Sequence, residues 1–452
     1  MPGGSGYLEL TDGFAGEIVR PNDPGYDAAR AVWNSMIDRR PALIVRPAGT
    51  DDVVAALRFA REQELVTAVR CGGHSIPGFS TCDDGIVIDL SRMRGVDVDP
   101  DRRTARVRGG SLLAELDDAA QAHGLVCPVG VVSHTGVAGL TLGGGMGRLQ
   151  RKLGLTIDSL LAVELVTADG QVVRASEEEN PELFWGMRGA GANFGIVTAF
   201  EFLLHPLQGP VTHGTVTHPI ERAEELAERF RELMEDAPDE LWASFGMAAG
   251  GDARGPVATV SVLHSGSPLD AERDLAGLRA LADPLEDSIE PKPYLVSQRL
   301  FDAPMEWGQR FSMKSAFLAS LPNTLVRGWA DQLSRVSDGA EGGISVWAWG
   351  RRIAAVAEEQ TAFTGRNAAV WAAAEIVWKD AALDDACRAW ARASADSAAP
   401  HAALGRYVND VTEVGGDVAR MIYGERKYQR LVALKREWDP DNVFRLNQNI
   451  TP

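Results

Sequence analysis

Cysteine is scarce in this chain of 452 residues, with only Cys71, Cys82, Cys127 and Cys387 present. Four cysteines spread over such a length exclude a disulfide framework, and their spacing contains no pair of Cys-x-x-Cys metal knuckles. We therefore expect four reduced thiols, none of them catalytic, and no metal site.

Long apolar runs and an excess of basic residues are also missing. No stretch approaches the ~20 apolar residues of a membrane span, and the first residues do not form a basic secretory leader. The 45 Lys and Arg residues against 63 Asp and Glu give a net charge of −18, the wrong sign for a general nucleic-acid or anionic-membrane binder. We expect a cytoplasmic protein with neither kind of partner, in which any phosphate is held locally.

The composition that remains is that of an ordinary globular protein, with 45% hydrophobic and 24% charged residues. The length predicts two or three domains. Up to His205-Pro206, short β-rich runs alternate with helical patterns, which indicates mixed α/β packing. Beyond that point amphipathic helical windows are interleaved with strands, which indicates a second, α+β domain.

The predicted elements follow from hydrophobic period and turn residues. Strands are predicted at 42–45, 65–69, 86–90, 104–107, 160–167, 256–264, 311–318, 343–349 and 370–378, and helices at 220–236, 268–282 and 322–337. The turn Asp99-Pro100-Asp101 favours a hairpin-like pairing of 86–90 with 104–107. Ser111 is the expected N-cap of a helix that ends at His123-Gly124.

A first glycine motif follows a predicted strand and reads Arg70-Cys71-Gly72-Gly73-His74-Ser75. Two adjacent glycines let the backbone turn and present successive N–H groups to an anion such as a pyrophosphate. A tight turn with a surface histidine is the alternative. An imidazole beside a phosphate-binding loop is also placed to contact the organic part of the same cofactor.

A second glycine-dense stretch runs from Gly130 to Gly147. Its small side chains allow close approach of the main chain to a flat or extended ligand, although a buried glycine-rich loop would have the same composition. Gly143-x-Gly145 is a weak match to a dinucleotide-binding fingerprint of NAD enzymes, because that fingerprint should follow the first strand of a βαβ unit and open a helix, and residues 148–155 give a poor helix.

Two further motifs lie downstream. Residues 181–197 read as a helix with aromatic residues on one face, a glycine loop and a strand; the tail contains Tyr407-Val408-Asn409 and closes on Asn447-Gln448-Asn449. The aromatic residues of 181–197 are expected in the core. The amides of the tail are candidates for contacts with a ligand edge, or for ordinary backbone capping.

Taken together and in this order, the motifs resemble those of the berberine bridge enzyme-like FAD-linked oxidases of the vanillyl-alcohol oxidase superfamily. The matching segments are Arg-x-Gly-Gly-His, Gly-Val-x-Gly-Leu-x-Leu-Gly-Gly-Gly-x-Gly, Pro-Glu-Leu-Phe-Trp-Gly-x-Arg-Gly-Ala-Gly-x-Asn-Phe-Gly-Ile-Val, Tyr-x-Asn, and Trp-Asp-Pro-Asp-Asn-x-Phe-Arg-x-Asn-Gln-Asn-Ile. The resemblance covers essentially the whole chain, and five ordered motifs are far more specific than any one of them.

The resemblance implies an α+β fold. A PCMH-type FAD-binding domain of two subdomains, residues 1–206 and 406–452, would carry an inserted α+β substrate domain, residues 207–405, built on an antiparallel sheet. The histidine of the first motif carries the flavin in such proteins, so His74 is the expected covalent attachment site. The cofactor-binding residues implied are Arg70, Cys71, Gly72, Gly73, His74, Ser75, Gly78, Gly130, Ser133, His134, Gly136, Val137, Gly139, Gly143, Gly144, Gly145, Gly147, Ile196, Val197, Tyr407, Asn447 and Asn449.

Two departures from the family pattern matter. Some members add a second flavin link through a cysteine whose place here is taken by Val132. Valine has no nucleophile, so we expect a single attachment, with Cys127 five residues upstream as the only substitute. Thr135 stands where members use a valine or a bulkier aliphatic residue to admit or block dioxygen. Threonine is close to valine in size, which favours an oxidase.

Flavin oxidation of an alcohol or amine needs a base for the O–H or N–H proton. Tyr407, which resembles the family's active-site tyrosine, is the expected base. Its free pKa of ~10 would have to be lowered by hydrogen bonds or positive charge, for which Lys314 is a candidate, although a structural or surface lysine is the alternative. Asn409 is expected to position the ring edge or the substrate. These three residues, Tyr407, Lys314 and Asn409, form the predicted catalytic set.

The substrate domain is less informative. Trp347, Trp349 and Trp371 are expected either in an aromatic-walled pocket or in the core, and Arg351 and Glu375 are candidate polar contacts. The predicted activity is removal of a hydride from a C–OH or C–N carbon of a small organic or secondary-metabolite substrate, with O₂ as the acceptor, in a monomer or homodimer. The alternatives are a dehydrogenase of the same fold, a flavoprotein that cyclises a natural product, an NAD(P) enzyme, and a non-enzymatic flavin carrier.

Overall fold

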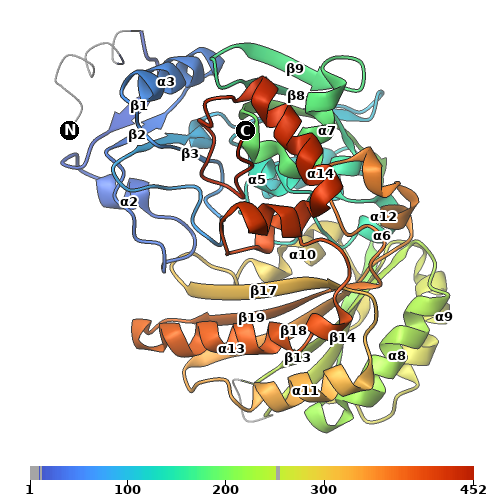
Figure 1. The fold of residues 1–452 in the computed structure, drawn as a ribbon. Coiled ribbons are helices and arrows are strands. Elements are labelled where there is room, and N and C mark those ends of the chain that lie inside the picture. The colour runs from blue at the N-terminus through green and yellow to red at the C-terminus, as the bar shows by residue number, and fades with distance from the viewer. Residues whose placement is uncertain (1–9, 11–12, 251–254) are drawn as a thin grey trace.

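The computed structural model describes residue 10 and residues 13–250 and 255–452. Figure 1 shows two halves, one above the other, with the chain crossing to the lower half after β10 and returning through α14. The helices and strands confirm the predicted mixture of both types, and the larger sheets are antiparallel as expected for the second half.

A four-stranded sheet forms the first part of the upper half. Its order is β1 (Glu17–Val19), β2 (Leu43–Arg46), β4 (Ile86–Asp89) and β3 (Thr67–Arg70). The parallel pairing of β4 with both β2 and β3 is made possible by the crossover helix α3 (Thr50–Glu62). The start of α3 is fixed by Asp52, whose carboxylate accepts hydrogen bonds from the backbone N–H groups of Ala48 and Ala15.

A five-stranded antiparallel sheet forms the second part of the upper half. Its order is β5 (Val96–Asp99), β6 (Thr104–Arg108), β10 (Ile196–Leu203), β8 (Leu160–Val166) and β9 (Val172–Ser176). The upper half also contains helices α4 (Leu113–Gln121), α5 (Val137–Leu142), α6 (Gln150–Leu153) and α7 (Pro181–Ala190), and the short pair β7 (Leu125–Val126) with β11 (His205–Pro206). Helix α2 (Tyr26–Arg30) packs against the four-stranded sheet, where its buried Tyr26 and Ala29 join the same apolar cluster as Ile44 and Val87.

Two local predictions were wrong here. The strand at 104–107 pairs with β5, not with the strand at 86–90, which belongs to the other sheet. The turn at 99–101 is present as predicted, but the strand that pairs with 104–107 across it is β5. Sequence patterning predicted no strand at β5, because its charged residues at alternate positions leave only a weak apolar signal. Ser111 does not cap α4: its hydroxyl bonds the backbone of Gly95, and the Glu115 carboxylate accepts from the N–H of Leu112 instead.

The lower half is an eight-stranded antiparallel sheet. Its strands are, in order, β15 (Glu286–Asp287), β12 (Val211–Pro219), β14 (Val257–His264), β13 (Leu241–Ala248), β18 (Ala340–Ala348), β19 (Val370–Trp378) and β17 (Arg310–Leu318), with β16 (Glu290–Lys292) beside β12. Helices α8 (Ala223–Glu235), α9 (Pro268–Arg279), α11 (Asn323–Leu333) and α13 (Asp384–Asp396) lie on its far side in Figure 1.

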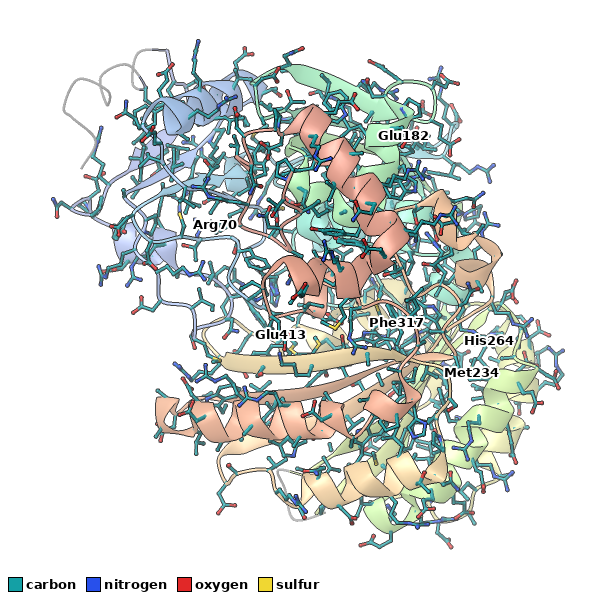
Figure 2. All side chains as sticks on the ribbon, in the orientation of Figure 1. Arg70, Glu182, Met234, His264, Phe317 and Glu413 are labelled. Atoms are coloured by element: carbon teal, nitrogen blue, oxygen red, sulfur yellow. The ribbon has the colours of Figure 1, made fainter. Side chains whose placement is uncertain are left out.

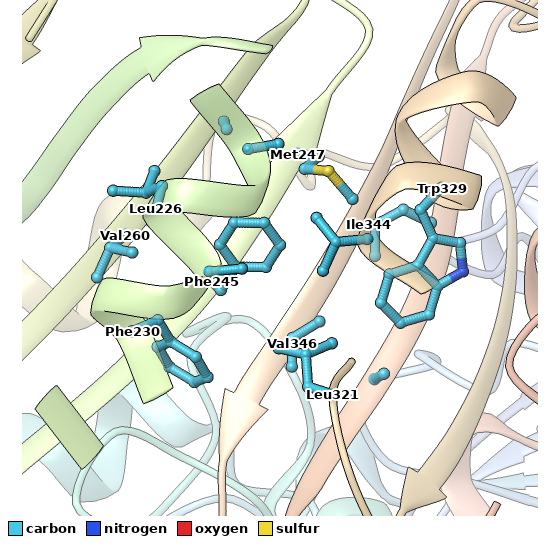
Figure 3. Packing of buried hydrophobic residues seen from close by; sticks show 14 of the residues in the cluster. Leu226, Phe230, Phe245, Met247, Val260, Leu321, Trp329, Ile344 and Val346 are labelled. Atoms are coloured by element: carbon cyan, nitrogen blue, oxygen red, sulfur yellow. The ribbon is translucent and has the colours of Figure 1, made fainter. Parts of the chain in front are cut away.

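The core of this half lies between the sheet and those helices. Figure 3 shows Phe230 of α8 and Trp329 of α11 beside the strand residues Phe245, Ile344 and Val346, all of them buried. Because side chains alternate along a strand, the same strands turn their other side chains toward the upper half. One face of the sheet therefore packs in the core of the lower half, and the other face borders the space between the two halves.

The C-terminal segment belongs to the upper half. Helix α14 (Gly416–Trp438) is bent at Gly424, where φ is +71°, and packs against α7, as Figure 1 shows in red beside green. The remaining helices, α10 (Tyr294–Gln298) and α12 (Arg352–Ala355), lie at the border of the halves. The domain boundaries at 206/207 and 405/406 stay a prediction. Within the described ranges, no helix has the length and apolar character needed to cross a membrane.

Candidate active site

A cavity of about 450 Å³ lies between the two halves of the molecule. Both glycine loops, the start of β10, the segments at 407–410 and 444–448, and side chains from β17, β18 and β19 line it. The volume is within the roughly 300–1,000 Å³ of small-molecule sites. Segments from opposite ends of the chain therefore meet at one site.

The first glycine loop is held against the second. β3 ends at Arg70, whose guanidinium donates to Asp89 at 2.7 Å and to the carbonyl of Ala29 at 2.6 Å. Figure 2 places Arg70 in the upper half beside β3. A Cβ on Gly72 would lie 2.3 Å from the backbone nitrogen of Gly136, so only glycine permits this approach. Arg70 thus anchors the loop from outside the cavity lining.

His74 lies on the cavity wall between two other aromatic side chains, Trp33 and His134. Its ring stacks on Trp33 with centroids 4.9 Å apart, and its Nε2 is 2.7 Å from Nδ1 of His134. Burial, together with His134, lowers the pKa of His74 to about 3. The imidazole is therefore neutral near pH 7, and its Nδ1 makes no hydrogen bond with the described residues.

The predicted cofactor-binding residues fall into two groups. Those that line the cavity are Cys71, Gly72, Gly73, His74, Ser75, Gly130, Gly136, Gly139, Gly143, Ile196, Val197, Tyr407 and Asn447. Those that lie behind its walls are Arg70, Gly78, Ser133, His134, Val137, Gly144, Gly145, Gly147 and Asn449.

The second group shapes the loops. Gly145 and Gly147 pack so closely that a Cβ would lie 2.1 Å from Thr156 Oγ1 and 1.9 Å from the carbonyl of Val129, respectively. The backbone N–H of Ser133 donates to Asp302 at 2.8 Å, and its hydroxyl bonds the same carboxylate. Local sequence does not distinguish a glycine that faces a ligand from one that faces its own scaffold.

Tyr407 and Asn409, two members of the predicted catalytic set, are hydrogen-bonded to each other. The Tyr407 oxygen accepts hydrogen bonds from Asn409 Nδ2 at 3.0 Å and from the backbone N–H of Gly145 at 3.2 Å. Burial nevertheless raises the pKa of Tyr407 well above its usual value, and Asp410 raises it further. The expectation of a lowered pKa was wrong, and the phenol is neutral near pH 7. Both bonds are donated to the oxygen, so its own hydrogen finds no acceptor among the described residues.

Lys314 is not brought to Tyr407. Its Nζ donates to Thr412 Oγ1 at 2.5 Å and to the carboxylate of Glu413, which Figure 2 shows at the junction of the two halves. Lys314 shares its strand face with Ala316 and Leu318, which pack in the core of the lower half. The strand prediction was correct, but the lysine lies on the side of β17 that does not line the cavity.

Two carboxyl groups and two tryptophans complete the site. Glu375, a predicted candidate for a polar contact, lines the cavity. Trp347 and Trp371 line it too, in keeping with the pocket alternative, whereas Trp349 packs in the core against Phe317. Asp410 also lines the cavity and was missed. In the sequence, the one indication that Asp410 belongs to the site is its position directly after the Tyr-x-Asn motif.

The remaining candidates lie as follows. Val132 and Thr135 are in the cavity lining. Cys127 is fully buried in the core of the upper half, outside that lining, and burial raises its pKa well above the usual value. Arg351 donates to the carbonyl of Ala237 at 2.5 Å, away from the cavity. Among the described cysteines, the one in the cavity lining is Cys71, whose pKa burial raises to about 11.

Fold and site define a class: a two-part nucleotide-cofactor enzyme whose site lies between a glycine-rich cofactor half and an antiparallel sheet. Residues 41–176 match the family model described as FAD binding domain, and residues 406–451 match the one described as Berberine and berberine like.

Whole-chain comparisons agree with these matches. The chain is 34% identical to (R)-6-hydroxynicotine oxidase of Paenarthrobacter nicotinovorans over 97% of both chains, and 30% identical to an FAD-linked oxidoreductase of Dictyostelium discoideum over 98% of this chain and 96% of that one. It superposes on the crystal structure of 6-hydroxy-D-nicotine oxidase from Arthrobacter nicotinovorans with a TM-score of 0.88 at 32% identity, covering 97% of this chain and 98% of that one. The chain belongs to the berberine bridge enzyme-like family of FAD-linked oxidoreductases.

Proposed function

We propose that this enzyme is an oxidase that removes a hydride from a C–OH or C–N carbon of a small organic substrate, with FAD bound covalently and only through His74. One observation carries the proposal: His74, glycines from each of the two loops and the Tyr407–Asn409 pair line the same cavity. The relatives named as oxidases support the reaction type. FAD supplies the two-electron acceptor, and O₂ reoxidises it with release of peroxide.

The residues present fit such a cofactor. The glycine loops bring backbone close to the cavity, and a Cβ on Gly139 would meet nothing within 4 Å, so there is open space beside it. Asn447 Oδ1 and Gln448 Oε1 are buried acceptors without a partner in the described structure, which suits the N–H and O–H donors of a flavin nucleotide.

Charge is consistent with this assignment. The described residues that line the cavity include no Lys or Arg, so the phosphates would be met by backbone N–H groups of the glycine loops. The neutral His74 ring has the free electron pair that a bond to the flavin requires. Because Nε2 faces His134, Nδ1 is the nitrogen we assign to that bond.

Tyr407 acts as a hydrogen-bond donor in this proposal. Gly145 and Asn409 hold its oxygen in place, and the hydroxyl hydrogen is left to bind an oxygen or nitrogen of the substrate. A neutral phenol of raised pKa does not serve as the base, so the substrate proton must go to another group.

The test is the mass and colour of the denatured protein. Unmodified protein is expected to stay yellow after acid precipitation and to carry one FAD by mass spectrometry. His74→Ala should release all flavin into the supernatant, whereas His205→Ala, which removes an imidazole outside the cavity, should not. Flavin still attached in His74→Ala would refute the attachment. A colourless protein that binds no added FAD would refute the function, and substrate oxidation in air without peroxide would refute the oxidase assignment.

A further inference from the structure

Two carboxyl side chains on the cavity wall have no cationic partner. Glu375 lies on β19 and Asp410 on the single turn that follows Tyr407, and both line the cavity. Neither makes an ion pair with any residue that the structure describes. Buried carboxyl groups are usually paired, so two unpaired ones in one cavity need a reason.

The carboxyl groups of Asp410 and Glu375 differ in the hydrogen bonds that hold them. Asp410 Oδ2 accepts a hydrogen bond from Trp371 Nε1 at 3.0 Å and its carboxyl also bonds the Ser315 side chain, while its backbone N–H donates to the carbonyl of Tyr407 at 3.0 Å. Glu375 accepts only from Ser345 Oγ, at 3.4 Å. Asp410 is therefore fixed in place, and Glu375 retains acceptor capacity toward the cavity.

The surroundings leave this negative charge unbalanced. Burial raises the pKa of both carboxyls to about 7, and repulsion from Glu375 is a smaller part of the rise at Asp410. On β17 the only nearby cation, Lys314, is paired with Glu413, and β18 contributes Ser345. The other titratable groups of the cavity lining are neutral near pH 7, because burial lowers the pKa of His74 and raises the pKa values of Cys71, Tyr407 and Tyr423. A cation that enters would therefore stabilise the ionised pair.

Aromatic groups flank the same position. Trp371, which donates to Asp410, meets Trp347 edge to face with ring centroids 5.4 Å apart, and both indoles line the cavity. Trp371 and Glu375 lie on the same face of β19, because they are four residues apart on a strand. Tryptophan beside carboxylates is the arrangement that binds ammonium groups, through cation–π and ionic attraction together.

We propose that Glu375 and Asp410 make this site specific for a substrate with a basic amine: Asp410 holds the ammonium group, and Glu375 takes its proton before oxidation. The inference rests on the proposed function and names its substrate class. In the proton transfer one ammonium N–H bond breaks and one O–H bond forms on Glu375, which leaves a neutral amine and a neutral carboxylic acid. The two-electron oxidation that follows is that of the proposed function and needs no further oxidant.

A binding experiment on the unmodified holoprotein tests the charge. Choline and its uncharged isostere 3,3-dimethylbutan-1-ol are titrated by calorimetry. We expect choline to bind at least about tenfold more tightly, a difference of ~1.4 kcal/mol. Because choline carries a permanent charge, its affinity should rise several-fold between pH 6 and pH 8 as the carboxyls lose protons, and that of the isostere should not. Equal affinities, or a flat pH profile for choline, would overturn the proposal.

Variants test the residues. Glu375→Gln and Asp410→Asn should each weaken choline binding about tenfold and leave the isostere unaffected. Glu341→Gln is the matched control, because Glu341 is an exposed carboxylate on the neighbouring strand β18. It should leave choline affinity unchanged, and an equal loss in this control would overturn the assignment.

Proton transfer has its own readout. With an amine substrate, Glu375→Gln should slow anaerobic bleaching of the flavin at saturating substrate, while Asp410→Asn should mainly raise the substrate concentration needed. An unchanged saturating rate in Glu375→Gln would remove it as proton acceptor. A yellow enzyme that is reduced by alcohols and does not prefer choline would overturn this inference and leave the proposed function standing, whereas a flavin-free protein would overturn both.

Discussion

Lys435→Met tests how the C-terminal segment is held against the cofactor half. The Lys435 ammonium is completely buried and uses all three of its donors, bonding Asp439 Oδ2 at 2.6 Å and the carbonyls of Asn193 and Phe444 at 2.9 Å each. Asn193 and Phe444 both line the cavity. Methionine matches the length and apolar stem of lysine, so the substitution removes the charge and its bonds and little volume.

The expected loss of stability depends on the Asp439 carboxylate, which the substitution leaves buried without its cation. Removing one partner of a buried ion pair costs about 3–5 kcal/mol because the other charge stays buried and uncompensated. Asp439 keeps two hydrogen bonds here, from the backbone N–H groups of Val443 at 2.8 Å and Phe444 at 2.9 Å, which places the expected loss near the lower end, at about 3 kcal/mol. That is a large fraction of the ~5–15 kcal/mol by which proteins are stable.

The assay is urea unfolding followed by tryptophan fluorescence. Arg327→Met is the matched control, because it removes a cation from an ion pair with Glu224 whose side chains are 64% and 36% exposed, and it should cost far less stability than Lys435→Met. The double variant Lys435→Met/Asp439→Asn removes the stranded charge and should recover part of the loss. The reasoning would be refuted if Lys435→Met lost no more unfolding free energy than Arg327→Met, or if the double variant were less stable than Lys435→Met.

Three further predictions concern the site. Tyr407→Phe should keep the flavin attached to His74 and slow its reduction by substrate by roughly 10²-fold, because a donor to the substrate is lost; an unchanged stopped-flow rate would contradict this. Gly143→Ala places a Cβ 2.2 Å from Asn409 Oδ1, so Asn409 must move and the reduction rate should fall while the protein mass still includes FAD; wild-type kinetics would show that the pair is not needed. Cys127→Ala should leave the flavin content of acid-precipitated protein unchanged, and any loss would reveal a second link.

Much of the fold was accessible from the sequence. The strands at 257–264, 310–318 and 370–378 lie within one residue of their predictions, because a strand's pattern of apolar side chains depends on near neighbours along the chain. The ordered glycine motifs also predicted correctly that segments near residues 72, 136 and 407 would meet, through the resemblance they carry.

The errors share one cause. β4 is a continuous apolar run up to Asp89 and β6 alternates apolar with charged residues, yet both read as β-rich segments beside one turn, and only long-range packing sends them to different sheets. Lys314 and Met313 are neighbours in sequence, but the pleat of β17 places the lysine on one face and lets Met313 line the cavity on the other. The sequence alone does not show which face of such a strand lines the cavity, because that depends on the segments that pack against it.

The chemistry of the site depends most on tertiary structure. Sequence alone, through the resemblance that its motifs carry, indicated that the two glycine loops and the Tyr-x-Asn motif at 407–409 serve one site. Only the folded chain decided that Tyr407 is a neutral phenol, that Lys314 is paired elsewhere, and that Glu375 and Asp410 share a cavity without a cation. The physical reason is that burial and electrostatic environment arise from atoms contributed by distant parts of the chain, which no local pattern records.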